Sequence, residues 1–148
     1  MKKISILFAL FLLFSFKPYK FEERYSLTVT VNDLRNSEGL VQFAIYNTEE
    51  SIPDEKYKKY YKIKTTAITN SKASITFIGL PNGFYAVNVL HDENQNGKVD
   101  KKSFPPLPKE GVGFSNYEKI GLSNRPKFSK AKFELKADMQ KEVKIIYF

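Results

Sequence analysis

Short runs in which apolar and polar residues alternate recur along this chain, and they restrict it to a fold built from β-strands. In residues 27–32, Leu, Val and Val alternate with Thr, Thr and Asn, which is typical of a strand buried on one face. Further apolar runs predict strands at residues 40–46, 63–68, 73–78, 84–90, 132–135 and 143–148. Short strands separated by turn signals favour an all-β fold, an antiparallel β-sandwich of prealbumin-like or immunoglobulin-like type.

The connections between these runs predict the remaining elements. Residues 36–39 form a turn signal, so we expect the first two strands to form a hairpin, and Asn70-Ser71 marks another turn. A serine, an early proline and acidic residues favour one short helix within residues 51–61. Residues 100–125 are rich in proline and glycine, which predicts one long irregular loop on the β-scaffold.

The N-terminal segment, residues 1–20, is expected to be a signal peptide. Lys2 and Lys3 form a positive n-region, and residues 4–16 form an apolar run that is too short to cross a bilayer comfortably. We therefore expect an exported chain, periplasmic or extracellular, in which residues 21–148 form a single β-sandwich domain with no stable membrane span. An uncleaved anchor and a buried core helix are the alternatives for the apolar run.

Composition limits how such a domain is stabilised and what it binds. The chain has no cysteine, so no disulfide forms in an oxidising compartment, and a bound ion is an alternative staple. The net charge of +8 is spread over the whole chain, which favours a solvated surface over a nucleic-acid interface. The partners that we consider are an envelope protein or a glycan, and the sequence leaves the oligomeric state open.

The segment H-D-E-N-Q-N-G-K-V-D at residues 91–100 carries the clearest chemical motif. Within it, D-x-N-x-N-G-x-x-D places side-chain oxygens at alternate positions before a glycine that permits a sharp turn, as in calcium loops. The predicted metal ligands are the side chains of Asp92, Asn94, Asn96 and Asp100, the carbonyl of Lys98 and, from outside the loop, Glu110.

The expected ion is Ca²⁺, because an all-oxygen ligand set favours calcium over zinc or copper. The loop is not an EF-hand, since Ser103 stands where that motif has a bidentate glutamate and no flanking helices are predicted. Glu110 or Glu93 would supply the missing carboxylate. The alternative is an Asx-rich turn that ends a strand, in a binding module that holds no ion.

Longer segments of the chain resemble a known family. The run G-L-P-N-G-F-Y-A-V-N-V-L-H-D-E-N-Q-N-G-K-V-D at residues 79–100 looks like the core of domain-of-unknown-function family 2141, which comprises small exported bacterial proteins. P-K-E-G-V-G-F-S-N at residues 108–116 resembles its second motif. R-P-K-F-S-K-A-K-F at residues 125–133 resembles its third, although Lys130 stands where an acidic residue is expected. The resemblance covers roughly residues 26–148 and implies an exported β-sandwich with no established enzymatic activity.

Other residues suggest alternative chemistry. The single histidine, His91, would join Asp92 and Glu110 as acid–base groups of a hydrolase that acts on envelope polymer. The sequence has no thiol nucleophile and no G-x-S-x-G element, so a non-catalytic function is favoured. Gly111-Val-Gly113 is predicted to be a backbone turn rather than a phosphate loop.

Two aromatic groups have both a binding and a packing interpretation. Residues 56–62 interleave lysines with tyrosines, which suits single-stranded nucleic acid or sugar, but an amphipathic segment with half-buried tyrosines is favoured. Four aromatic residues of the irregular region are expected to form a satellite core rather than to line a ligand groove. They are Phe104, Phe114, Tyr117 and Phe128.

Overall fold

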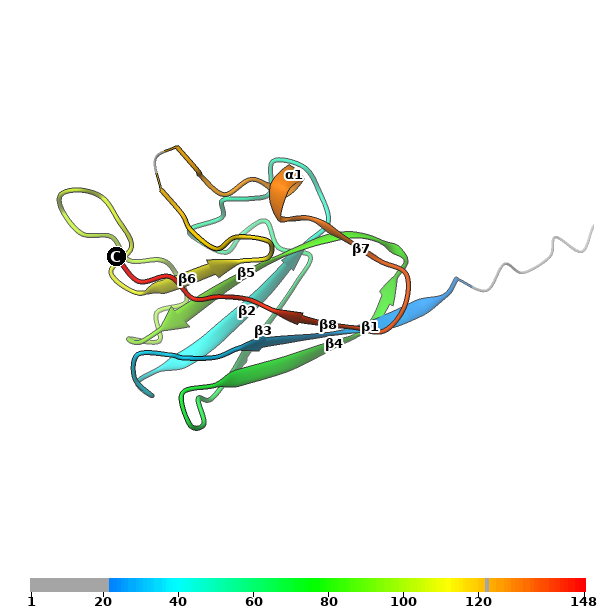
Figure 1. Ribbon diagram of the computed structural model, residues 1–148, viewed down its shortest axis with the longest axis horizontal. Helices are drawn as coiled ribbons and strands as arrows, with labels where there is room; N and C mark the ends of the chain where they lie inside the picture. The colour runs from blue at the N-terminus through cyan, green and yellow to red at the C-terminus, as the bar shows by residue number, and fades with distance from the viewer. Residues whose placement is uncertain (1–21, 122) are drawn as a thin grey trace, which may run out of the picture.

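The computed structural model describes residues 22–121 and 123–148, which form a sandwich of two β-sheets (Figure 1). The smaller sheet has the strand order β4-β1-β8, and the larger sheet has the order β3-β2-β5-β6, with β7 also paired to β5. The predicted all-β sandwich is therefore confirmed. The strands are β1 (Arg24–Val31), β2 (Leu40–Tyr46), β3 (Lys62–Thr66), β4 (Ala73–Pro81), β5 (Gly83–Asp92), β6 (Gly111–Phe114), β7 (Phe133–Leu135) and β8 (Met139–Glu142), and helix α1 spans Phe128–Ala131.

The predicted leader, residues 1–20, lies outside the described residues. The first described strand begins at Arg24, shortly after that segment. Within residues 22–121 and 123–148, none of the helices has the length and apolar character needed to cross a bilayer.

One hydrophobic core fills the space between the two sheets. The alternation predicted for β1 is confirmed, because Leu27, Val29 and Val31 are fully buried while the residues between them are partly exposed. These side chains pack against the inner face of the larger sheet. That face contributes Val41, Phe43 and Ile45 from β2 and Tyr85, Val87 and Val89 from β5.

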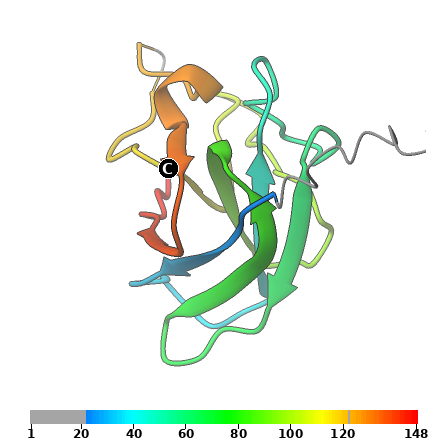
Figure 2. The same cartoon turned by 90° about the vertical axis from the view of Figure 1, so that its right-hand side faces the viewer.

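The larger sheet also buries its outer face. Residues 47–61, 115–121 and 123–131 lie over that face, at the top of Figures 1 and 2. They contribute to a second apolar cluster, which contains Ala44, Tyr46, Ile52, Tyr57, Ala86, Leu90, Val112, Phe114, Tyr117, Phe128 and Ala131. As a result, β5 is buried on both faces, and every side chain from Tyr85 to Asp92 is buried. The position of this strand fixes where the acidic loop begins.

The predicted hairpin between the first two strands is wrong. β1 and β2 lie in different sheets, and residues 32–39 carry the chain from one sheet to the other. β1 pairs in antiparallel fashion with β4 and in parallel with β8, so the sandwich is not purely antiparallel. β3 and β4 also belong to different sheets, joined through a turn in which Asn70 and Ser71 have positive φ. Turn signals mark where the chain reverses, whereas the packing of two layers decides which strands pair.

The predicted helix within residues 51–61 is also wrong, because this segment is irregular. The buried carboxylate of Asp54 accepts hydrogen bonds from the backbone N–H of Lys59 at 2.6 Å and from the hydroxyl of Tyr46 at 3.3 Å. Tyr57, with φ of 49°, is buried. These contacts hold the segment in a series of turns, so a helical hydrogen-bond ladder does not form.

Two predictions for the C-terminal half are wrong. Gly111–Phe114 forms strand β6 rather than a turn. Because two of its residues are glycines, the C-terminal segment can pass close to this strand. A Cβ on Gly113 would lie 2.5 Å from the carbonyl oxygen of Lys144. The last strand is Met139–Glu142, and residues 143–148 run beside β6 with a bridge between Val112 and Ile146.

The predicted satellite core is confirmed for three of its four aromatic residues. Phe114, Tyr117 and Phe128 are buried in the cluster on the outer face of the larger sheet. Phe104 does not join them and is 91% exposed. Its loop, held by a bridge between Lys101 and Pro108, projects away from the sheets.

Gly39 is expected to be indispensable at the start of β2. It has φ of +69°, and a Cβ there would lie 2.0 Å from the carbonyl oxygen of Asp92. We expect Gly39→Ala to lower the free energy of unfolding by about 3 kcal/mol or more, because backbone strain and steric overlap each cost roughly 1–3 kcal/mol. Urea denaturation measures this change.

Gly79→Ala is the matched control for that experiment. Gly79 has nearly the same φ, +68°, but no atom lies within 4 Å of the position its Cβ would take. The Gly79→Ala substitution then costs only the strain of a left-handed backbone, about 1–2 kcal/mol. Equal losses in the two variants would show that the close approach of Gly39 to Asp92 does not matter.

Candidate metal site at the end of β5

The acidic loop begins at the last residue of the buried strand β5. Asp92 pairs with Leu40 of β2, and Gly39 passes directly over its carbonyl group. The loop then runs to Glu110, which immediately precedes β6. Both ends of the loop are therefore anchored on neighbouring strands of one rigid sheet.

The side chain of Asp92 folds the loop back on itself. Its Oδ1 accepts a hydrogen bond from the backbone N–H of Asn96 at 3.1 Å, and its Oδ2 accepts one from Gly97 at 2.8 Å. Gly97 has φ of +74°, which is the turn conformation that the sequence predicted for it. The carboxylate of Asp92 is buried, so these hydrogen bonds form in a site shielded from water.

Asn94, Asn96 and Asp100 converge above Asp92. The side-chain Nδ2 atoms of Asn94 and Asn96 each donate to Oδ2 of Asp100 at 2.7 Å. These two hydrogen bonds lower the pKa of Asp100, with Asn94 making the larger contribution. Rotation of either amide by a half-turn would present its oxygen in place of its nitrogen. The loop thus turns two amide N–H groups towards one carboxylate, whereas the sequence predicted that the same side chains would turn their oxygens towards an ion.

Lys98 lies in the same turn, and its backbone N–H donates to Oδ1 of Asn96 at 3.0 Å. The next residue, Val99, donates its N–H to the carbonyl of Glu55 at 2.9 Å. Lys101 also forms an ion pair with Glu55 at 2.7 Å. The far side of the loop is therefore attached to the segment 47–61.

Glu110 reaches the loop from the start of β6. Its Oε1 accepts hydrogen bonds from the backbone N–H groups of Glu93 at 3.0 Å and Asn94 at 3.4 Å. Its Oε2 is buried and has no hydrogen-bond partner. Burial raises the pKa of Glu110, and the negative charge of Asp92 adds to that effect. Hydrogen bonds thus link Glu110 to the backbone of the loop, Asp92 to the backbone of Asn96, and Asp100 to the side chains of Asn94 and Asn96.

The charges of this site are not balanced by neighbouring side chains. Asp92 and Glu110 are both only 4% exposed, yet neither takes part in an ion pair with any described lysine, arginine or histidine. Buried carboxylates are ordinarily paired, protonated or bound to a metal. In the part of the chain that the structure describes, no three histidine, aspartate or glutamate side chains form a compact metal cluster. A cation here would therefore also need amide, carbonyl or water oxygens, as calcium does.

His91 lies on the opposite face of β5 from the two carboxylates. Side chains alternate along a strand, so His91 points towards the C-terminal segment while Asp92 points outward. Its ring is fully buried, with Nδ1 2.7 Å from the hydroxyl of Tyr147 and Nε2 3.0 Å from the carbonyl oxygen of Glu38. The structure does not bring His91 together with Asp92 and Glu110 as an acid–base trio.

A family model identifies the family of this chain. A family model described as "Uncharacterized protein conserved in bacteria (DUF2141)" matches residues 29–144, from within β1 to just past β8. The chain belongs to the DUF2141 family. No curated protein matches it, and no solved structure matches it.

Sequence reasoning missed several residues that build the site of this DUF2141 protein. Arg35 forms a bidentate ion pair with Glu93, and its guanidinium also lies over the ring of Tyr147, 4.6 Å from the ring centre. Tyr57 enters from the segment over the outer face of the sheet. No sequence spacing connects these residues to the loop, since each comes from a distant segment. Gly39, one residue before β2, was the only local sequence feature that could have indicated the close approach to Asp92.

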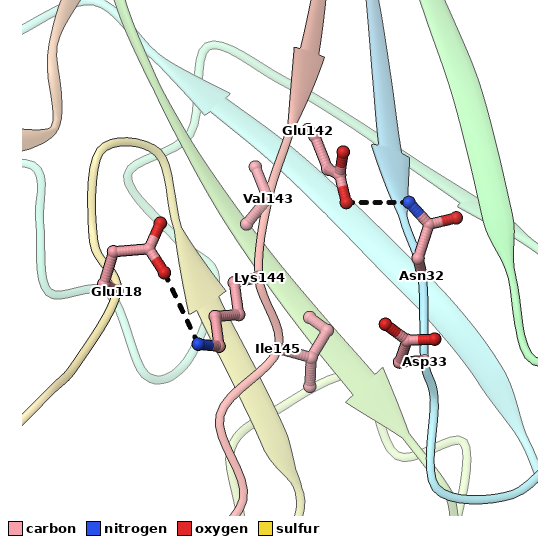
Figure 3. A pocket seen from close by; sticks show the side chains of 7 residues that line it. All are labelled: Asn32, Asp33, Glu118, Glu142, Val143, Lys144 and Ile145. Carbon is pink, nitrogen blue, oxygen red and sulfur yellow. Dashed lines mark hydrogen bonds and ion pairs between the residues drawn. The ribbon is translucent and has the colours of Figure 1, made fainter.

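A separate surface cavity of about 460 Å³ lies beside the end of β1 (Figure 3). It is lined by Asn32, Asp33, Glu118, Glu142, Val143, Lys144 and Ile145. Asn32 donates to Glu142 at 2.8 Å, and Lys144 reaches Glu118 at 3.4 Å. Its acidic side chains are exposed, so their hydration costs little and no bound group is required to balance them.

The Arg35–Glu93 pair is expected to hold the 32–39 connection against the loop. Arg35 donates through Nε to Glu93 at 2.8 Å, and Asn36 donates to the same carboxylate at 2.7 Å. The hydrogen bond from Arg35 is the main cause of the lowered pKa of Glu93. Lysine cannot reproduce this planar fork, so we expect Arg35→Lys to lower the free energy of unfolding by about 1 kcal/mol.

Arg24→Lys provides the control for this measurement. Arg24 pairs with Glu22, but the two side chains are 55% and 59% exposed, and water screens their attraction. We expect a change below about 0.5 kcal/mol in that variant. If chemical denaturation gave equal changes for both arginines, the partly buried pair at the loop would have no special role.

Proposed function

We propose that this DUF2141 protein is an exported, non-catalytic binding or structural module whose loop, residues 92–100, binds one calcium ion. The observation that supports this proposal most strongly is the pair of buried carboxylates, Asp92 and Glu110, that no described basic side chain neutralises. A divalent cation would offset both charges, and burial of unpaired charges is otherwise costly.

The donor set favours calcium among the common ions. The candidate ligands are the side chains of Asp92, Asn94, Asn96 and Asp100, the carbonyl of Lys98 and the carboxylate of Glu110. All of them are oxygen donors, which suit calcium rather than zinc or copper. Six donors of this kind also fall within the range of six to eight that calcium takes.

An ion at this place would cross-link separate segments of the chain. It would connect the end of β5 to Asp100 and to the start of β6, which are held in the described structure by hydrogen bonds alone. Because the chain has no cysteine, no disulfide can supply that restraint. The leader-like residues 1–20 support export, and the loop end of the sandwich is where we place contacts with an envelope protein or a glycan.

Thermal unfolding of the purified protein tests the ion site. We expect calcium at about 100 times its Kd to add about 2.7 kcal/mol to the free energy of unfolding relative to EDTA. The informative variant is Asp100→Asn, because Asp100 is partly exposed and the substitution removes charge without changing size. In EDTA we expect this variant to lose some stability, since Asp100 accepts hydrogen bonds from Asn94 and Asn96, and we expect calcium to stabilise it less than the wild type.

Two further variants complete that experiment. Asp92→Ala should lose stability even in EDTA, since it removes the acceptor of the Asn96 and Gly97 N–H groups. Glu134→Gln, on the distant strand β7, should respond to calcium as the wild type does. Superimposable melting curves of the wild type with EDTA and with calcium would refute the ion site and leave the loop as a hydrogen-bonded turn.

A further inference from the structure

Two buried polar atoms near the loop have no hydrogen-bond partner. They are the hydroxyl oxygen of Tyr57 and Oε2 of Glu110. The two residues are 6% and 4% exposed, so solvent does not reach these atoms. A buried polar group without a partner costs free energy. Oδ1 of Asn88 is a third such atom among the described residues. The unpartnered carboxylate oxygen of Glu110 is a position that a bound cation would satisfy.

The phenol of Tyr57 lies within the electrostatic field of the acidic site. Burial is the main cause that raises the pKa of Tyr57 well above its usual value of 10.0, and Tyr46 and Asp54 contribute next. The charges of Asp92 and Glu110 raise it further. No hydrogen bond joins the phenol to either carboxylate. Tyr57 therefore senses the charge of both acids from a segment that Val99 and Lys101 attach to the loop.

The direction of the Glu110 carboxylate is fixed by its other oxygen. Oε1 is held by the backbone N–H groups of Glu93 and Asn94, which belong to the loop itself. Oε2 consequently keeps its orientation whether or not an ion is bound. A preorganised oxygen of this kind loses little conformational freedom when it becomes a ligand.

Tyr57 is likewise held in place by the loop. Its segment is attached through the carbonyl of Glu55, which accepts the N–H of Val99 at 2.9 Å, and through the Glu55–Lys101 ion pair at 2.7 Å. The backbone N–H of Tyr57 donates to the carbonyl of Asp54 at 3.1 Å. The segment 47–61 is thus attached to the acidic loop through Glu55.

We infer that Glu110 closes the calcium site through Oε2 and that Tyr57 forms its buried wall, so that together they select calcium over magnesium. This inference rests on the calcium site proposed above. Magnesium gives up its bound water reluctantly, whereas calcium accepts more protein oxygens at longer and more variable distances. A wall of buried side chains leaves little room for retained water and therefore disfavours magnesium.

Titration calorimetry with calcium and with magnesium tests the role of Glu110. We expect Glu110→Gln to weaken calcium binding by about 10-fold or more, in line with losses seen when groups around a metal are changed. We expect the affinity for magnesium to fall less, so the ratio of calcium affinity to magnesium affinity decreases. Circular dichroism of the variant in EDTA establishes that it is folded before its affinity is compared.

Terbium luminescence tests the position of Tyr57 independently. Terbium takes calcium sites and emits when a nearby tyrosine transfers its excitation. We expect Tyr57→Phe to reduce this emission while terbium still binds, and the variant should fold because the lost hydroxyl has no partner. The control is Tyr25→Phe, since Tyr25 lies at the other end of β1, about 20 Å along the strand from Val31.

The outcomes separate this inference from the proposed function. If the wild type binds neither calcium nor terbium, the calcium site itself is refuted. If the wild type binds calcium but Glu110→Gln binds it equally well, and Tyr57→Phe leaves the terbium emission unchanged, the loop site stands and the closing wall is refuted. Weaker calcium binding in Glu110→Gln, together with reduced emission in Tyr57→Phe, supports the wall.

Discussion

Burial of β5 on both of its faces is the constraint on which the rest of the structure depends. One face of this strand packs in the core between the two sheets, and the other packs under residues 47–61, 115–121 and 123–131. Because side chains alternate along a strand, the last two residues of β5 lie on opposite faces of the sheet. His91 enters the inner layer beside the C-terminal segment, and Asp92 enters the outer layer beside Glu110.

This double burial explains why the acidic loop begins with a buried carboxylate. An exposed Asx-rich turn would leave its carboxylates hydrated, whereas Asp92 and Glu110 are held in a low-dielectric layer. The loop compensates with backbone N–H groups, which donate to both carboxylates. Hydrogen bonds from neutral N–H groups do not cancel net charge, and that remaining charge connects the geometry to a cation.

Local sequence patterns predicted the class of fold correctly. Alternation placed Leu27, Val29 and Val31 in the core, and the motif located the turn at Gly97. Patterns failed where distant segments decide the outcome. The 51–61 segment has helix signals, but its buried Asp54 accepts a hydrogen bond from Tyr46 of β2, and its Tyr57 packs in the outer-face cluster. Strand β1 pairs with β4 and β8 instead of with β2.

The sequence by itself determined most of the strands, most of the turns and the oxygen-rich order of residues 92–100, since each depends on neighbours within a few positions; β6 and the end of the last strand are the exceptions. Only the tertiary structure decided the strand partners, the placement of Glu110 and Tyr57 at the loop, and the separation of His91 from Asp92. Strand pairing and burial are set by the packing of two layers and their covering segments. A pattern of period two is compatible with many such pairings, so it does not select among them.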